Sequence, residues 1–228
     1  MQMDKTVMNT TALFDIASFN LDRADAPFVM PWPQAGNPTA MLPFRHFQEW
    51  QAFIEERGLH AVAPRIVGDK FRRAQRLYLL AWLDADLVKA GELVALTALE
   101  LALTDRYGGF FRQRHAQAGN KQKRKQAPML HDLLEYLVDG DGLTDAQLPF
   151  TQRYGGSIIP VLHRSWATHG ESNSGNVSRP TLAEIRNSLA HGDPFDGLPW
   201  SGLLELVRDL IEYAYRSHLQ EGRTGCCS

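Results

Sequence analysis

The 228-residue chain contains little cysteine: its two cysteines, Cys226 and Cys227, are adjacent and lie close to the end of the sequence. Two neighbouring cysteines cannot form a disulfide framework, which excludes the class of small disulfide-stabilised folds and favours a reducing environment. The first residues show neither a long apolar run nor a cleavage-site pattern, so we expect no signal peptide. We therefore predict a cytoplasmic protein.

The chain also lacks an excess of charge of either sign, with 24 Lys and Arg against 26 Asp and Glu. No overall positive field would attract nucleic acid, so any such contact must rest on local basic patches. The most apolar stretch, residues 77–103, is interrupted by charged residues that include Asp84, Lys89 and Glu92. Such a stretch cannot span a bilayer, and we expect no membrane association.

Residues that would hold a metal or a cofactor are not grouped in the sequence. The eight histidines show no H-x3-H spacing and no Cys–His spacing, which argues against a structural or catalytic metal. The sequence contains neither the P-loop motif of nucleotide-binding proteins nor the G-x-S-x-G motif of hydrolases. We predict no metal and no cofactor.

The first 43 residues are rich in proline and show no sustained periodicity, which predicts an irregular segment with a short strand at "TALFDIASF". A small helix is expected over residues 44–57, ended by Gly58. Residues 1–65 are therefore interpreted as an irregular, proline-rich N-terminal extension with a short helix.

Apolar residues recur at helical spacing from Asp69 onward, which predicts a helix with Asp69 as N-cap and Gly91 as its end. A second helix, apolar almost all round, is expected to follow and to end at Gly108. Its one polar stripe comprises Thr97, Glu100 and Thr104. We expect this stripe to be exposed, and the alternative for Glu100 is an acidic partner of a functional cleft.

The rest of the chain alternates loops and amphipathic helices. We expect a basic loop over 112–128, a helix over 129–140, a loop-rich stretch up to residue 180, and a last helix over 201–219. Residues 66–220 are thus predicted to form an all-α antiparallel helical bundle, and residues 221–228 a flexible tail.

The segment "TLAEIRNSLAHGDP" predicts a short helix from about Leu182 to His191. Thr181 and Glu184 form a capping-box pattern, and a glycine and a proline follow the helix. Arg186 offers two parallel donors to a phosphate, and His191 on the last turn suits general acid–base chemistry. The two residues lie about 140° apart around the helix axis, so one helix cannot easily aim both at one phosphate.

This segment, with Arg186, Asn187 and His191 in an R-x4-H arrangement, resembles the motif of HEPN domains. The helix order agrees with that resemblance, which covers roughly residues 70–219. It implies an HEPN-like bundle and a metal-independent endoribonuclease that is commonly dimeric, with two motif helices at a shared cleft. Arg186 would polarise the scissile phosphate, His191 would exchange protons with the attacking 2′-hydroxyl or the leaving oxygen, and Asn187 would orient one of these groups.

The expected partners are therefore RNA and a second copy of the chain, and the family's toxin and phage-defence roles leave an antitoxin or another protein partner open. The basic run at Lys121, Lys123, Arg124 and Lys125 is a candidate RNA contact, although such runs are commonly solvated loops. The alternative hypothesis is a non-catalytic HEPN-like interaction or nucleotide-binding module. In that case the helix would only form a dimer seam, which would bury Arg186 and His191, whereas catalysis needs both exposed in one cleft. A purely structural interpretation of the two residues is a surface arginine and a histidine that satisfies the last helix carbonyls.

Overall fold

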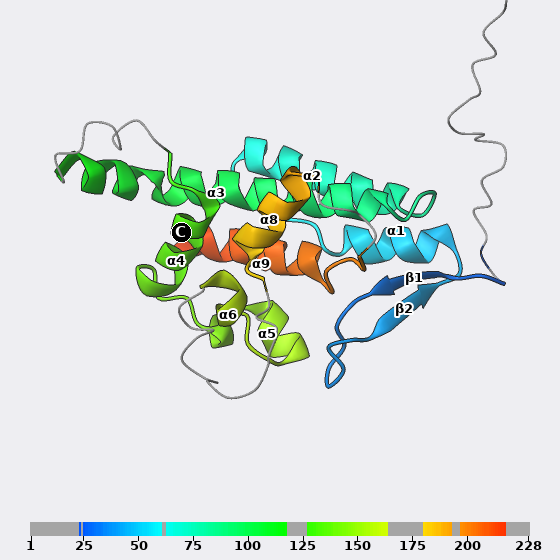
Figure 1. Cartoon of the computed structure of the whole chain (residues 1–228). Coiled ribbons are helices and arrows are strands. Elements are labelled where there is room, and N and C mark those ends of the chain that lie inside the picture. The colour runs from blue at the N-terminus through cyan, green and yellow to red at the C-terminus, as the bar shows by residue number, and fades with distance from the viewer. Residues whose placement is uncertain are drawn as a thin grey trace, which may run out of the picture.

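The computed structural model describes residue 23 and residues 25–60, 63–117, 127–163, 180–192 and 197–217. Within these residues the fold is mostly helical, as the sequence predicts, with one two-stranded sheet. The strands and first helices are β1 (Phe28–Pro31), β2 (Met41–Phe44), α1 (Phe47–Glu55), α2 (Arg65–Leu80) and α3 (Leu87–Gln117) (Figure 1). The later elements are α4 (Leu130–Asp139), the 3₁₀ helix η3 (Asp145–Gln147), α5 (Pro149–Tyr154), α6 (Ile159–Leu162), α8 (Leu182–Ala190) and α9 (Leu203–Ala214).

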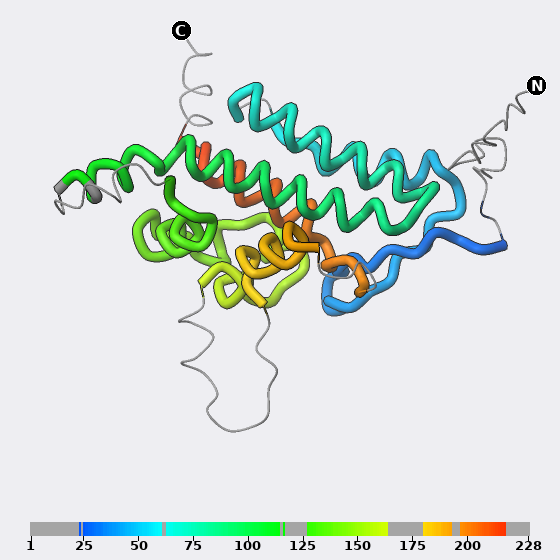
Figure 2. Tube along the Cα trace, turned by 45° about the horizontal axis from the view of Figure 1, so that its top comes forward, coloured from blue at the N-terminus to red at the C-terminus, as the bar shows by residue number. Residues whose placement is uncertain are grey.

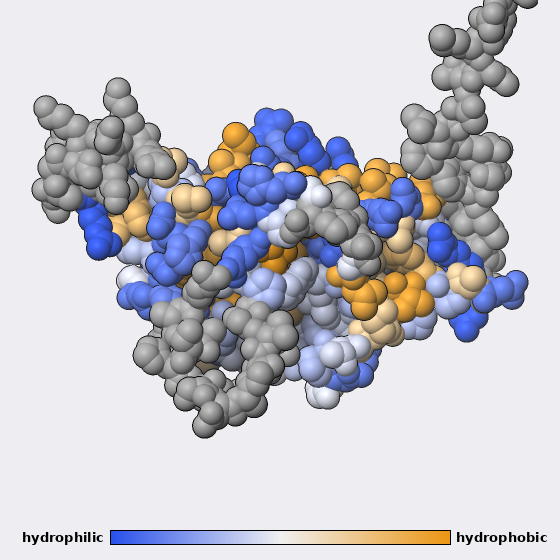
Figure 3. All heavy atoms as spheres, viewed as in Figure 1, coloured by the Kyte–Doolittle hydropathy of each residue, from blue (hydrophilic) through white to orange (hydrophobic). Residues whose placement is uncertain are grey.

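Helix α3 is the centre of the bundle, and α2, α4, α8 and α9 all pack against it. Its 31 residues correspond to a length of about 46 Å. Figure 2 shows α2 and α3 side by side and antiparallel, with α9 and α8 on the other side of α3. The outer face of α2 is largely hydrophilic (Figure 3). No helix in the described ranges is both long and apolar enough to cross a membrane.

The expected boundaries of the first two bundle helices are wrong. Helix α2 begins at Arg65 rather than at Asp69, and neither Gly91 nor Gly108 ends a helix, because both lie inside α3. At Gly91 a Cβ atom would come within 2.7 Å of the Tyr78 ring, so this glycine allows α2 and α3 to approach closely. The expected start of the basic loop at residue 112 is also wrong, since α3 continues to Gln117.

The proline-rich segment contains a β-hairpin that the sequence did not indicate, whereas the expected strand "TALFDIASF" lies outside the described residues. Strands β1 and β2 pair antiparallel, with Phe28 opposite Phe44 and Val29 opposite Pro43. A two-stranded sheet has only edge strands, so it tolerates a proline in each of them. The rings of Phe28 and Phe44 pack edge-on against Trp50 of α1, at centroid distances of 5.1 and 4.9 Å, which attaches the hairpin to the bundle.

The remaining predicted helices exist with trimmed ends. Helix α1 lies inside the predicted 44–57, α4 matches 129–140 within a residue at each end, and α9 begins two residues later and ends earlier than expected. The stretch predicted to be rich in loops contains η3, α5 and α6 in its described part. These short elements pack on α4 and α9.

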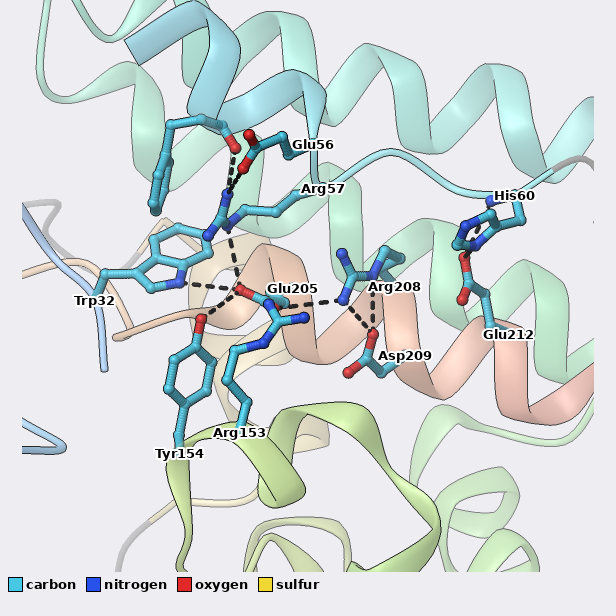
Figure 4. A network of polar contacts seen from close by, with 11 residues as sticks. Trp32, Glu56, Arg57, His60, Arg153, Tyr154, Glu205, Arg208, Asp209 and Glu212 are labelled. Carbon is cyan, nitrogen blue, oxygen red and sulfur yellow. Dashed lines mark hydrogen bonds and ion pairs between the residues drawn. The ribbon is translucent and has the colours of Figure 1, made fainter. Parts of the chain in front are cut away.

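A buried carboxylate, Glu205 on the first turn of α9, connects elements that are distant in sequence (Figure 4). The Nε1 atom of Trp32, next to the hairpin, donates to it at 3.1 Å, and the Nε atom of Arg57, next to α1, donates at 3.2 Å. From α5, Tyr154 donates its hydroxyl at 3.0 Å and Arg153 forms an ion pair. Each bond compensates part of the cost of burying this charge.

Gly202, directly before α9, packs closely against the elements that surround Glu205. Gly202 has a φ of 72°, and a Cβ atom there would lie 2.8 Å from Pro33 and 2.9 Å from Phe150. Only glycine combines this left-handed conformation with so close an approach. The hairpin and α5 therefore meet directly at the start of α9.

Replacing Glu205 with alanine is expected to destabilise the protein by about 3–5 kcal/mol, because it removes the buried carboxylate that pairs with the buried Arg57. It also leaves the Trp32 and Tyr154 donors without this acceptor. The matched control is Glu212→Ala on the same helix. Glu212 is 17% exposed and contacts the ring and backbone N–H of His60, whose side chain is 74% exposed, so a smaller loss of about 1–2 kcal/mol is expected. Urea unfolding of the three proteins measures both values. Equal losses in the two variants would contradict the assigned role of Glu205.

Candidate functional site

Helix α8 has the capped ends that the sequence predicts. The Thr181 hydroxyl accepts a hydrogen bond from the Glu184 backbone N–H at 3.3 Å, and the Glu184 carboxylate accepts the Thr181 N–H at 2.9 Å. The helix ends at Ala190, with His191 as the C-cap residue and Gly192 in the left-handed region at φ 79°. These caps fix where the three motif residues lie along the helix.

One face of α8 is buried and the other carries the motif. Leu182, Ala183 and Ile185 are buried, and the helix packs on α3, α4 and α6. On the other face Asn187 is half-buried and His191 is exposed. Figure 1 shows α8 crossing in front of α3.

The Arg186 guanidinium is held by two acceptors. It forms an ion pair with Glu100 of α3 at 2.8 Å and donates a hydrogen bond to the Asn187 side-chain oxygen at 3.1 Å. The side chain of Arg186 is 30% exposed and that of Glu100 is 25% exposed, so the pair is only partly shielded from water. The neighbours of the guanidinium fix its orientation, and its Nε atom is buried with no hydrogen-bond partner among the described residues.

For Glu100 we preferred an exposed stripe over an acidic partner of the cleft, and this preference is wrong, because Glu100 is partly buried and pairs with Arg186. The signal was present, since Thr97, Glu100 and Thr104 form the only polar stripe on an otherwise apolar helix. A polar stripe on a central helix indicates a polar neighbour as readily as solvent. The sequence alone could not identify Arg186 as the partner of Glu100, because it lies 86 residues further along the chain.

His191 is joined to the motif through the backbone. Its N–H donates to the carbonyl oxygens of Asn187 at 2.9 Å and Ser188 at 3.2 Å. Asn187 therefore contacts the Arg186 guanidinium with its side chain and His191 with its main chain. Within the described part of one copy, no contact joins the side chains of Arg186 and His191.

The chain that follows α8 is anchored to α3 by a buried charge pair. Lys89 and Glu92 lie 3.3 Å apart, the Lys89 ammonium donates to the Leu198 carbonyl at 2.8 Å, and Glu92 accepts the Trp200 N–H. Sequence reasoning treated these two charges only as interruptions of an apolar run. Their role depends on a contact with a segment more than a hundred residues away, which no local pattern reveals.

Burial raises the pKa of Glu92 from 4.5 to about 7, against the opposing effects of the Lys89 ammonium and the Trp200 N–H. The neighbouring Tyr78 hydroxyl is fully buried with no hydrogen-bond partner among the described residues. Its own pKa is raised by burial and, to a smaller extent, by the charge of Glu92. The contact of Lys89 and Glu92 with the backbone at Leu198 and Trp200 therefore depends on the protonation state of Glu92.

The remaining predicted site residues, Lys121, Lys123, Arg124 and Lys125, lie outside the described residues. The described ranges hold no group of three His, Cys, Asp or Glu side chains placed to bind a metal ion. No family model, no curated protein and no solved structure matches the chain.

The raised pKa of Glu92 predicts how stability depends on pH. The folded state binds this proton more tightly than the unfolded chain, so the contribution is full below pH 4.5 and is lost as pH rises to about 7. Relative to Glu92→Gln, the wild type is expected to lose up to about 3 kcal/mol over that interval.

Denaturant unfolding at a series of pH values checks this prediction. Glu56→Gln, at a position where the side chain is 76% exposed, is the surface control and should keep the wild-type profile. Parallel profiles for the wild type and Glu92→Gln would show that Glu92 titrates outside this range.

Proposed function

We propose that the chain is a metal-independent endoribonuclease of the HEPN kind that cleaves RNA by attack of a 2′-hydroxyl on the adjacent phosphate. The observation that carries this proposal is the geometry of α8. An exposed histidine sits at the end of a capped helix, five residues after a partly exposed arginine whose guanidinium is oriented by Glu100 and Asn187. A histidine can transfer protons and an arginine can stabilise charge that develops on a phosphate, so the pair suits phosphodiester cleavage without a metal.

In the proposed reaction, Arg186 binds the non-bridging oxygens of the scissile phosphate and Asn187 keeps the guanidinium oriented. The 2′-oxygen forms a bond to phosphorus while the bond from phosphorus to the 5′-oxygen breaks. One proton leaves the 2′-hydroxyl and one reaches the departing 5′-oxygen, and His191 takes part in this exchange. The products are a 2′,3′-cyclic phosphate and a free 5′-hydroxyl.

We further propose that two copies of the chain form the site. Arg186 and His191 lie about 140° apart around α8, so their side chains leave one helix in different directions. Two α8 helices related by a two-fold axis can place the arginine of one copy beside the histidine of the other. A toxin or phage-defence role, with or without an antitoxin, belongs to the same proposal.

One observation favours a second candidate function, a non-catalytic interaction module. The charge of Arg186 is already matched by Glu100 at 2.8 Å, as in an arginine with a purely structural role. A phosphate would have to compete with this carboxylate for the guanidinium. The two candidates differ in whether the purified protein cleaves RNA.

His191→Ala is expected to lower the rate of RNA cleavage by about 10²–10⁴-fold, because proton transfer by a positioned side chain contributes that much. Arg186→Ala should lose activity similarly, and Arg186→Lys should restore little, because an ammonium cannot make two parallel bonds to a phosphate. Chelation by EDTA should change nothing. Gel analysis of labelled RNA, with end-group analysis of the products, measures each effect.

His131→Ala is the matched control, since His131 has a side chain that is 47% exposed and pairs only with Glu135 on its own helix. Thermal unfolding of each variant confirms that the fold is kept. Cleavage that survives His191→Ala, or that requires a divalent metal, would assign α8 to an interaction module instead.

A further inference from the structure

Helix α2 carries more positive than negative charge. It contains five basic residues and one acidic residue in 16 positions, whereas the whole chain has 24 basic and 26 acidic residues. The basic residues are Arg65, Lys70, Arg72, Arg73 and Arg76. The opposite face of α2 is buried in the core, so this charge lies on the outer, hydrophilic surface of the bundle (Figure 3).

Most of this charge is not neutralised locally. Asp69, the one acidic residue of α2, lies 2.9 Å from Arg72 and 3.6 Å from Arg65. Arg73 and Arg76 are exposed, and in the described ranges neither has a carboxylate within ion-pair distance. Four of the five cations are arginines, the residue best suited to bidentate contact with phosphate.

A cavity of about 470 Å³ opens beside this basic face, between the end of α1 and α2. Its apolar lining includes Ile54, Leu59, Phe71 and Leu79, and its polar lining includes Arg65, Arg72 and Arg76 together with Glu55 and Asp69. The volume is in the range of small-molecule sites. A flat aromatic ring fits such an apolar floor, while an attached phosphate can reach the arginines at the rim.

We propose that the basic face of α2 and this adjoining cavity bind single-stranded RNA, with phosphates on Arg72, Arg73 and Arg76 and one base in the cavity. The choice of RNA among polyanions rests on the proposed function. The surface is separate from the motif, because α3 lies between α2 and α8 (Figure 2). It adds affinity without taking part in the cleavage reaction.

Two features favour a single nucleic-acid strand over other anionic partners. A duplex keeps its bases stacked and cannot place one in the cavity, whereas unpaired bases are readily bound on apolar and arginine surfaces. A membrane-binding helix needs a continuous apolar face, but the exposed apolar side chains of α2, Ile66 and Leu80, lie at its opposite ends.

The test uses the wild-type chain and a fluorescent single-stranded 2′-O-methyl RNA, which has no free 2′-hydroxyl and therefore binds without being cleaved. Arg72→Gln/Arg73→Gln/Arg76→Gln should weaken binding at least about tenfold at roughly 0.1 M salt and flatten the plot of log K against log salt by about 2. Asp69→Asn is a control with the opposite expected effect, because it removes a negative charge from the same surface. It frees Arg65 and Arg72 and should tighten binding.

Gly68→Leu tests the cavity separately from the charge. Gly68 lines the cavity, and a Cβ atom there would meet no atom within 4 Å, so the new side chain enters open space. Single-stranded binding is expected to fall about tenfold, within the range measured for losing one stacked base, while duplex binding is unchanged. Thermal unfolding should show an undiminished fold, since leucine favours a helix more than glycine does.

Unchanged binding by the triple arginine variant would overturn the proposal, as would equal loss of single-stranded and duplex binding in Gly68→Leu. Stronger binding to phosphatidylserine vesicles than to RNA would assign α2 to a membrane surface and overturn it too. RNA binding without any RNA cleavage would contradict the ribonuclease proposal and leave this inference standing. The two proposals therefore fail separately.

Discussion

The buried carboxylate of Glu205 is the constraint on which the arrangement of the other elements depends. A charge without solvent must be surrounded by donors, and here these come from the hairpin, from the residue after α1 and from α5. Trp32 lies 173 residues away in sequence, Arg57 148 and Tyr154 51, so this one side chain brings the hairpin, α1 and α5 to the start of α9. The close contacts of Gly202 with Pro33 and Phe150 make the same junction sterically tight.

The motif helix α8 is held by polar contacts near both of its ends. At one end, Thr181 and Glu184 satisfy the first turn of α8. Beyond the other end, Lys89 and Glu92 hold the backbone at Leu198 and Trp200 against α3, just before the fixed start of α9. The chain around His191 is thus held from both sides while the imidazole itself remains exposed. The proposed ribonuclease function would require such positioning of His191 on a rigid scaffold.

Local patterns in the sequence predicted the features that depend on neighbouring residues. The capping box of α8 follows from short-range chemistry, and the structure confirms it. The predicted ends of α8 and α4 are also correct to within one residue. The ends of α2 and α3 could not be predicted from their glycines. A glycine also occurs inside a helix where a neighbouring element packs too closely for a side chain, and the sequence does not show that contact. Gly91 stays helical since the Tyr78 ring packs against it.

The hairpin and the polar networks escaped prediction for a related reason. Four-residue strands that each contain a proline show too little alternation to be recognised, and the aromatic packing of Phe28 and Phe44 on Trp50 is what stabilises them. The partners of Arg186 and Glu205 are likewise distant in sequence. Their residue types were visible, but their pairing follows only from the fold.

The central proposal is that Arg186 of one copy and His191 of another act on one phosphate, and a mixing experiment tests it most directly. Arg186→Ala and His191→Ala, each inactive alone, are co-expressed in equal amounts so that mixed dimers form. Half of the dimers are then mixed, and each holds one intact site of two, so about a quarter of the wild-type cleavage rate is expected to return. A mixture as inactive as its components would contradict a site shared between two copies.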